Sequence, residues 1–216
     1  MIADNIRKIE SELPEHVRLV AVTKYHSLED TQAVIDAGVL DLGESRVQDF
    51  LKKYEVLGDG PRWHFIGHLQ KNKVKYLIGK TFLIHSVDSL ELLEVIDRES
   101  KKKGLITSIL LQLNLAREDS KSGFLEEDLN SVLKVIPRYK NTKVLGLMAM
   151  GPLTQNNEEI RNVFVELKRI YDRIKEESLS SAIQMEYLSM GMTDDYRIAI
   201  EEGSNMIRIG RKIFNS

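Results

Sequence analysis

Lys24 is the residue of this sequence whose position most clearly suggests chemistry. It closes the apolar run of "RLVAVTKYHS" (residues 18–27), which has the pattern of a buried strand ending on a cationic side chain. An amine at the mouth of an apolar fold loses hydration, which favours its uncharged, nucleophilic form. Such an amine can form a Schiff base with a carbonyl substrate or with pyridoxal phosphate. A lysine that reaches out to solvent is the ordinary alternative.

A second group of residues could bind an anion. In "LSMGMTDDYRIAI" (residues 188–200), Ser189, Gly191 and Thr193 stand directly before a helix expected to begin near Asp194. Hydroxyl and backbone N–H donors at such a point suit a phosphate, although Thr193 could simply cap the helix. The later stretch "IRIG" adds a second glycine turn at Gly210.

Arg208 lies between Ile207 and Ile209 in an expected strand, so its side chain points to the opposite face from theirs. It could form a structural ion pair between helices, or it could line the interior of the fold. In the second case its guanidinium could donate to a pyridine nitrogen. That contact would keep the nitrogen unprotonated and weaken the ring as an electron sink.

Metal and thiol chemistry are not expected. His64 and His68 are four residues apart, but "WHFIGHLQ" reads as a strand running into a glycine turn, where that spacing does not bring two rings to one ion. His64 is expected to be hydrogen-bonded inside the fold or to line a site. The chain has no cysteine, which excludes disulfides and thiolate catalysis.

The elements that carry these residues alternate between strand and helix. Apolar runs predict eight strands, near residues 18–24, 39–43, 62–66, 82–86, 106–112, 143–148, 184–189 and 205–209. Helical segments lie between them, and Gly79, Gly104 and Gly203 provide the left-handed turns that end three helices. This pattern predicts a (β/α)8 TIM-type barrel, with an open doubly wound sheet as the competing architecture.

The barrel is expected to occupy residues 1–216 as a single domain. No eighth helix is expected after "IRIG", and the extra amphipathic helix at the N-terminus would cover the gap that it leaves. In such barrels the site forms at the C-terminal ends of the strands, and phosphate often binds after strands seven and eight. Strand one neighbours strand eight, so Lys24 and the anion-binding loops would meet, as an aldehyde-phosphate cofactor requires. Met148, in "LMAM", would form part of the apolar wall.

Composition limits the other partners. Of 216 residues, 42% are hydrophobic and 30% are charged, and the formal net charge is −2, so no nucleic-acid surface is expected. No apolar run reaches the roughly 20 residues that span a bilayer, and the N-terminus lacks the apolar core of a signal peptide. A cytoplasmic protein that does not contact membranes is expected.

Seven stretches together resemble the pyridoxal phosphate homeostasis protein family, whose members are similar to the N-terminal barrel of bacterial alanine racemase. They follow the family's order and cover nearly the whole chain: "LVAVTKYHS", "LGESRVQDF", "WHFIGHLQKNKVK", "HSVDS", "LLQLNLAREDSKSGF", "VLGLMAMGPL" and "LSMGMTDDYRIAIEEGSNMIRIGRKIF". The resemblance implies pyridoxal phosphate on Lys24, a phosphate site at Ser189, Gly191, Thr193 and Gly210, and Arg208 facing the pyridine nitrogen.

Two departures from the family's pattern lie in these stretches. Ser45 replaces the usual asparagine near the cofactor ring, so a hydrogen bond there would be shorter or mediated by water. Arg211 stands where a smaller residue is common, and it would add positive charge if its side chain folds over the phosphate.

Three functions remain open at the level of sequence. The resemblance favours a binding protein for vitamin B6 and amino-acid homeostasis, with no catalytic residue of its own. A monomer is expected, with pyridoxal phosphate-dependent apoenzymes as candidate partners. The alternative is an amino-acid racemase, which needs an acid or base on each face of the substrate. The third is an aldolase-like barrel that acts through a lysine Schiff base without cofactor.

Overall fold

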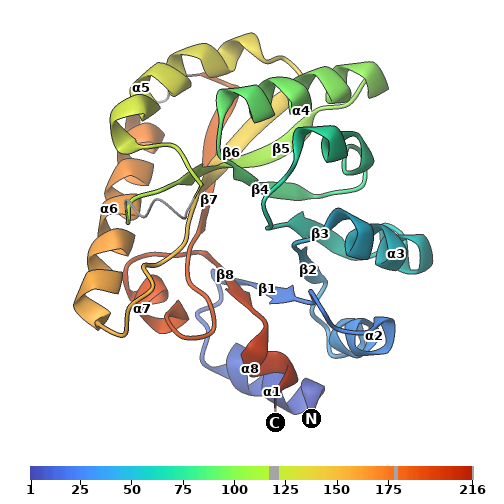
Figure 1. Ribbon diagram of the computed structural model, residues 1–216. Coiled ribbons are helices and arrows are strands. Elements are labelled where there is room, and N and C mark those ends of the chain that lie inside the picture. Colours follow the sequence, from blue (N-terminus) through green and yellow to red (C-terminus); the bar gives the residue numbers. More distant parts are fainter. Residues whose placement is uncertain (117–121, 178–179, 216) are drawn as a thin grey trace.

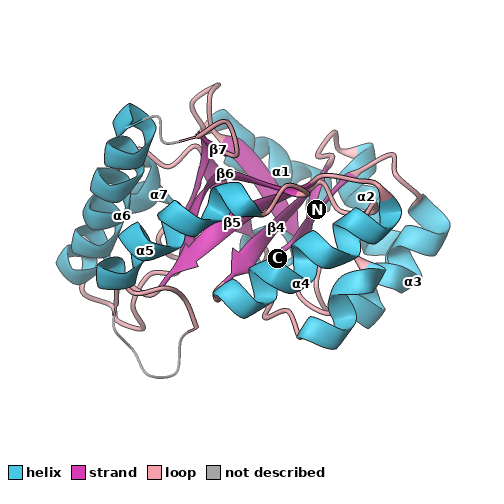
Figure 2. Ribbon diagram, turned by 90° about the horizontal axis from the view of Figure 1, so that it is seen from above, coloured by secondary structure: helices cyan, strands magenta, loops and turns pink. Residues whose placement is uncertain are grey.

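Eight parallel strands form a closed barrel in the order β1 to β8, and helices surround it (Figures 1 and 2). The computed structural model describes residues 1–116, 122–177 and 180–215. The strands are β1 (Arg18–Val22), β2 (Asp41–Glu44), β3 (Arg62–Phe65), β4 (Leu83–Val87), β5 (Thr107–Leu113), β6 (Thr142–Ala149), β7 (Ile183–Ser189) and β8 (Met206–Ile209). The predicted barrel is confirmed, and the open sheet is excluded.

Among the described residues, one helix precedes β1 and helical segments follow every strand. They are α1 (Ile2–Ser11), α2 (Leu28–Asp36), α3 (Val47–Leu57), the 3-10 helix η1 (Lys71–Tyr76), α4 (Leu90–Lys103), α5 (Glu126–Val135), the 3-10 turn η2 (Ile136–Arg138), α6 (Asn157–Glu177), α7 (Tyr196–Glu201) and α8 (Arg211–Phe214). The expectation of no eighth helix is wrong, because a single turn, α8, follows β8. None of the described helices is long and apolar enough to cross a membrane.

The helix boundaries follow from local chemistry. Ser27 precedes α2 and its hydroxyl accepts a hydrogen bond from the backbone N–H of Asp30 at 3.0 Å. Ser89 caps α4 in the same way. At the other end of α4, Gly104 has φ +65°, the left-handed conformation that favours glycine.

Alternation along the strands separates two cores. One face of each strand packs outward against the helices and carries most of the buried apolar side chains. The other face fills the barrel with a smaller apolar cluster: Val20, Leu83, Leu110, Leu145, Met148 and Met206. Val20 and Met206 belong to β1 and β8, so the interior-facing positions of these strands include Val22, Lys24, Arg208 and Gly210 by the period of two.

The barrel closes between the first and last strands. Arg18 to Ala21 of β1 pair in parallel with Met206 to Ile209 of β8. Outside this seam, α1 contacts both α2 and α8, and the side chain of Asn5 donates to the carbonyl of Ile213 at 3.0 Å (Figure 1). The N-terminal helix therefore covers the place where the short eighth helix leaves room, as predicted.

Candidate functional site

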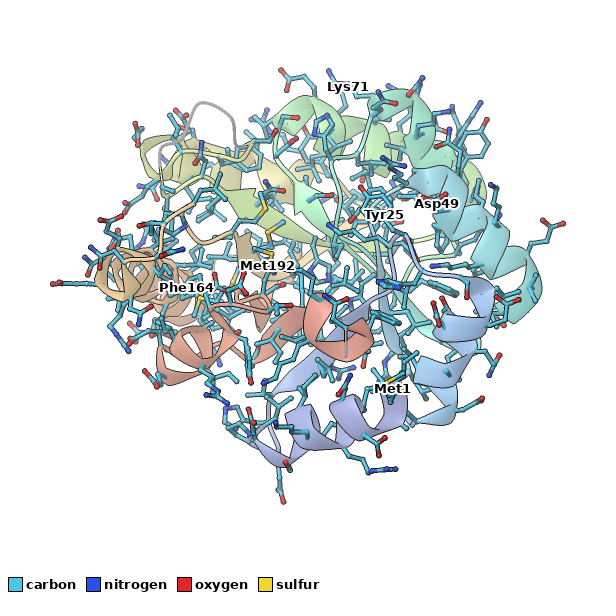
Figure 3. The ribbon with its side chains drawn as sticks, turned by 60° about the horizontal axis from the view of Figure 1, so that its bottom comes forward. Met1, Tyr25, Asp49, Lys71, Phe164 and Met192 are labelled. Atoms are coloured by element: carbon cyan, nitrogen blue, oxygen red, sulfur yellow. The ribbon has the colours of Figure 1, made fainter. Side chains whose placement is uncertain are left out.

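A cavity of about 270 Å³ opens at the C-terminal ends of β1, β7 and β8. Its lining combines the exits of these three strands: Val22, Lys24, Met192, Thr193, Asp194, Asp195, Arg208, Gly210 and Arg211. The predicted amine, the predicted arginine and both predicted glycine-turn loops thus border one space. Met192, labelled in Figure 3, belongs to the loop after β7.

Lys24 lies two residues beyond β1, which ends at Val22 rather than at the lysine. Its side chain is exposed, so the strong desolvation expected for a strand-end lysine is not found. The next residue, Tyr25, has φ +67°, the only positive φ of a non-glycine residue in the described ranges. This turn directs Tyr25 outward, where its ring is 70% exposed and lies 4.9 Å from the guanidinium of Arg46.

A buried ion pair holds the backbone just before Lys24. Lys53 of α3 donates to the carbonyl of Thr23 at 2.7 Å and to Glu44 Oε1 at 2.6 Å. The hydroxyl of Thr23 donates to the same carboxylate oxygen at 2.6 Å. Glu44 is fully buried and the side chain of Lys53 is 8% exposed, so the two charges compensate each other inside the protein. The backbone that leads from β1 to Lys24 is therefore held in place by this buried ion pair.

The loop after β7 is shaped by Gly191. Its φ is +94°, and an added Cβ would lie 2.6 Å from the Cβ of Ala199, so a larger residue does not fit there. Its carbonyl accepts the backbone N–H of Arg208 at 3.0 Å, which ties the loop to β8. Thr193 is half-buried and borders the cavity.

Backbone donors surround the cavity. Within the described residues, the N–H groups of Thr193, Asp194, Gly210 and Arg211 have no backbone or side-chain acceptor. Four such groups from two adjacent loops can hydrogen-bond the oxygens of an anion. The helix expected from Asp194 begins two residues later, at Tyr196, because the carboxylate of Asp195 accepts the N–H of Met192 at 2.5 Å instead.

Charges near these donors are balanced. The guanidinium of Arg211 binds the carboxylate of Asp194, and both side chains are largely exposed. Burial raises the pKa of Asp195, against the opposing effects of the Met192 N–H and of Arg208. The side chain of Arg211 is therefore engaged by Asp194 of the loop after β7, and both residues border the cavity.

Arg208 lines the barrel interior, as the sequence predicted in one of its two alternatives. It donates through Nη1 to the carbonyl and hydroxyl of Ser189, at 3.0 and 2.6 Å, and through Nη2 to the carbonyl of Ala149 at 3.1 Å. These bonds use three of the five N–H donors of a guanidinium, and no other acceptor is found among the described residues. Burial lowers the pKa of Arg208 to about 10, so it remains a cation at neutral pH and can donate toward the cavity.

Four predicted site residues are not part of the lining of this cavity: Ser189, Gly191, Met148 and Ser45. Ser189 is completely buried, and its hydroxyl bonds to Arg208 and to His85 rather than facing the anion-binding loops. Met148 is 2% exposed within the interior apolar cluster. Ser45 is half-buried at the exit of β2, where its backbone packs against Gly67. Their contacts with a cofactor stay predictions.

The sequence did not reveal how far the polar interior extends. Nε2 of His64 lies 2.8 Å from Asp41 Oδ1, and its Nδ1 lies 2.9 Å from Nε2 of His85. Nδ1 of His85 lies 3.0 Å from Ser189 Oγ. Burial would raise the pKa of Asp41, but bonds from Arg62 and His64 outweigh it and lower that pKa. The sequence did contain a signal for this: Asp41 stands within the apolar run "VLDLG", and the period of two places it on the same face of the strand as Gly43.

No metal site is found among the described residues. His64 is buried and hydrogen-bonded on both ring nitrogens, whereas His68 is exposed beside Asp88 at 3.4 Å. The two rings do not share a partner, which agrees with the reading of this pair as a strand and a turn.

Comparisons with known proteins assign the fold and the family. The family model described as "Alanine racemase, N-terminal domain" matches residues 1–215. A pyridoxal phosphate homeostasis protein of Aquifex aeolicus is 39% identical over 198 residues, which cover 91% of this chain and 86% of the relative. One from Synechocystis is 38% identical over 209 residues, or 96% and 94% of the two chains. The chain belongs to the pyridoxal phosphate homeostasis protein family.

Solved structures agree with this family membership. PipY of Synechococcus elongatus PCC7942, solved with and without PLP, has a TM-score of 0.91 and 30% identity, with each chain covered completely. The alanine racemase of Clostridium difficile 630 shares only the fold, with a TM-score of 0.80 at 15% identity. The matched region spans the whole of this chain but only 59% of the racemase chain.

Proposed function

We propose that this chain binds pyridoxal 5'-phosphate in the 270 Å³ cavity and takes part in intracellular vitamin B6 and amino-acid homeostasis. The observation that carries the proposal is that Lys24, Arg208 and four unengaged backbone N–H groups border one space. These are the groups that an aldehyde, a pyridine nitrogen and a phosphate require. The relative PipY, which is similar over its full length, is described with PLP bound.

Each group has a distinct part in the proposed binding. The amine of Lys24 would hold the aldehyde of the cofactor as a Schiff base, with loss of water. The N–H groups of Thr193 and Gly210, with the turn made possible by Gly191, would hold the phosphate oxygens. Arg208 would donate to the pyridine nitrogen through one of the N–H groups that its protein contacts leave unused. When bound, the cofactor would supply an electrophilic carbon and a conjugated ring.

The same cavity supports binding without turnover. A racemase needs a second acid or base opposite the lysine. In alanine racemase the opposing tyrosine comes from a second domain, and the partner subunit completes the site. The described lining of this cavity includes neither tyrosine nor histidine, and its two carboxylates, Asp194 and Asp195, are already bound by Arg211 and by the N–H of Met192. The ring of Tyr25 lies 5.9 Å from the Lys24 amine but is exposed and lines a neighbouring cavity. The named relatives are homeostasis proteins, not racemases. We therefore propose a monomeric carrier or regulator, with cofactor-dependent apoenzymes as candidate partners.

The test compares wild type with Lys24→Ala after incubation with pyridoxal phosphate, borohydride reduction and removal of free ligand. Peptide mass mapping is expected to place one reduced cofactor on Lys24 in the wild type and none in the variant. Lys52→Ala, which removes an exposed lysine from α3, is the control and should label normally. A wild type that carries no cofactor would refute the binding site and favour the cofactor-free barrel enzyme.

The same samples test turnover. Incubation of the loaded wild type with L-alanine, followed by chiral chromatography, is expected to show no conversion above the Lys24→Ala background. Sustained racemisation would overturn the binding-protein proposal and favour the racemase.

A further inference from the structure

A line of hydrogen bonds crosses the barrel interior from its N-terminal to its C-terminal end. It begins at Asp41 on β2, passes through His64 on β3 and His85 on β4, and reaches Ser189 on β7 and Arg208 on β8. Its successive distances are 2.8, 2.9, 3.0 and 2.6 Å. Every side chain in the line is at least 94% buried, so solvent does not compete for these bonds. We refer to these five residues as the interior relay.

The two ends of the interior relay permit only one direction of donation. A guanidinium can only donate hydrogen bonds, and an ionised carboxylate can only accept them. Arg208 therefore donates to Ser189 Oγ. At the far end, Asp41 Oδ1 accepts from Nε2 of His64. The carboxylate of Asp41 stays ionised because Arg62 binds both of its oxygens, at 2.8 and 2.6 Å.

The middle of the relay follows from its ends. With its proton on Nε2, a neutral His64 has only Nδ1 left as an acceptor, so Nε2 of His85 must donate to it. His85 Nδ1 then accepts from the hydroxyl of Ser189. Both rings are neutral, because burial lowers the pKa of His64 and holds that of His85 well below its usual value, with His64 and Arg208 adding to the second effect.

We propose that the interior relay fixes both histidines as neutral Nε2–H tautomers and thereby positions Arg208 as a rigid donor at the cofactor cavity. Asp41, His64, His85 and Ser189 are its positioning residues. The relay itself stands on the geometry of this chain, and only its effect on bound cofactor rests on the proposed function. Because Ser189 accepts from Arg208 while donating to His85, it cannot rotate freely, and Nη1 of Arg208 is held in place.

The relay does not conduct protons. Passing a proton along it would reverse every bond, and reversal would require Arg208 to accept or Asp41 to donate. The arrangement is therefore locked, which distinguishes it from a proton path between the two ends of the barrel. A locked donor has a fixed distance to the ring nitrogen, and a contact of fixed geometry to a charged donor is stronger than a mobile one.

The first measurement uses the cofactor-free protein and so does not depend on the proposed function. Long-range ¹H–¹⁵N correlation spectra of the ¹⁵N-labelled wild type at neutral pH, assigned with His64→Gln and His85→Gln, report where each ring carries its proton. The expected result is a neutral ring with the proton on Nε2 for both histidines. A proton on Nδ1 of either ring, or a doubly protonated ring, would overturn the proposal.

The second measurement follows bound pyridoxal phosphate by its visible absorbance and by the rate at which it is lost on dilution. Ser189→Ala and His85→Leu break the relay and are expected to shift the absorbance maximum and weaken cofactor binding by about tenfold. His85→Gln offers a carbonyl and an N–H in place of the two ring nitrogens and should restore most of both properties. The matched control is Ser86→Ala, which removes a buried β4 hydroxyl with no partner among the described residues.

Two patterns decide the outcome. Relay-breaking variants that keep the wild-type spectrum and affinity would overturn the positioning role, as would a Ser86→Ala protein with the same shift. If His85→Leu fails to fold, Ser189→Ala and His85→Gln still decide. If the wild type binds no cofactor, the proposed function fails, while the tautomers measured in the cofactor-free protein still decide the relay.

Discussion

The buried pair of Lys53 and Glu44 gives the sharpest test of how the lysine-bearing loop is held. Lys53→Met keeps the length of the side chain but removes the ammonium. Glu44 then stays completely buried with only the hydroxyl of Thr23 as a partner, and the carbonyl of Thr23 loses its donor. Breaking a buried ion pair from one side costs about 3–5 kcal/mol, a large part of the roughly 5–15 kcal/mol that keeps a protein folded.

Urea unfolding followed by circular dichroism measures this loss directly, with the slope checked for constancy. For a chain of this size each kcal/mol lowers the Tm by about 2–4 °C, so a fall of about 6–20 °C is expected. The control is Lys52→Met on the same helix turn, where the side chain is exposed and a change within about 0.5 kcal/mol is expected. Adding Glu44→Gln to Lys53→Met should recover part of the loss, because no unpaired charge is left behind.

A decrease in unfolding free energy below about 1 kcal/mol for Lys53→Met would refute this reasoning, since a buried carboxylate that has lost its cation destabilises the folded state by more than that. A loss of the expected size that Glu44→Gln does not relieve would also contradict it. That result would assign the effect to packing of the lysine stem rather than to its charge.

Three further predictions concern single side chains. The pKa of His85 lies well below 6.5 in the folded protein, so as the pH falls below about 6.5 the unfolded chain binds a proton at this ring while the folded protein does not. The free energy of unfolding should therefore decline by at most about 1.4 kcal/mol per pH unit for this ring. His85→Gln should flatten that slope in urea titrations at a series of pH values. Gly67→Ala places a Cβ 2.1 Å from the carbonyl oxygen of Ser45 and should cost about 1–3 kcal/mol, whereas Gly60→Ala, with nothing nearer than 3.8 Å, should cost less than 1 in the same assay. Equal effects of the two alanines would contradict the steric argument. Tyr171→Phe leaves the carbonyl of Met185 without its donor and should lower the unfolding free energy by about 1–3 kcal/mol, and a neutral result would show that water replaces the phenol.

Strand existence was predictable from the sequence because each strand is a short apolar run bounded by turn residues. The ends were less certain: β1 stops at Val22, since Thr23 turns its hydroxyl to Glu44 and Tyr25 adopts a left-handed conformation. That difference matters for the site, because it leaves Lys24 exposed in a loop rather than desolvated at the end of a strand.

The candidate site could be predicted from the sequence where a single strand or loop determines the position of the residue. The glycine turns at Gly191 and Gly210 and the inward face of Arg208 follow from local pattern. The role of Ser189 could not be predicted in this way, because its partner His85 lies on a strand far away in the sequence. Only the closed barrel brings the two side chains to 3.0 Å. Pairings of this kind depend on the register between strands, which the residue pattern of a single strand does not contain.

The seam between β1 and β8 also sets the order in which the site can be made. Lys24 follows the first strand, while Arg208 and Gly210 come from the last, and the two strands meet only where Arg18 to Ala21 pair with Met206 to Ile209. A ribosome releases the first strand long before the last, so during synthesis the lysine is present without its neighbours. The cavity proposed for the cofactor can therefore form only after the final strand has docked. On the proposed function, cofactor loading would follow completion of the chain rather than accompany its synthesis.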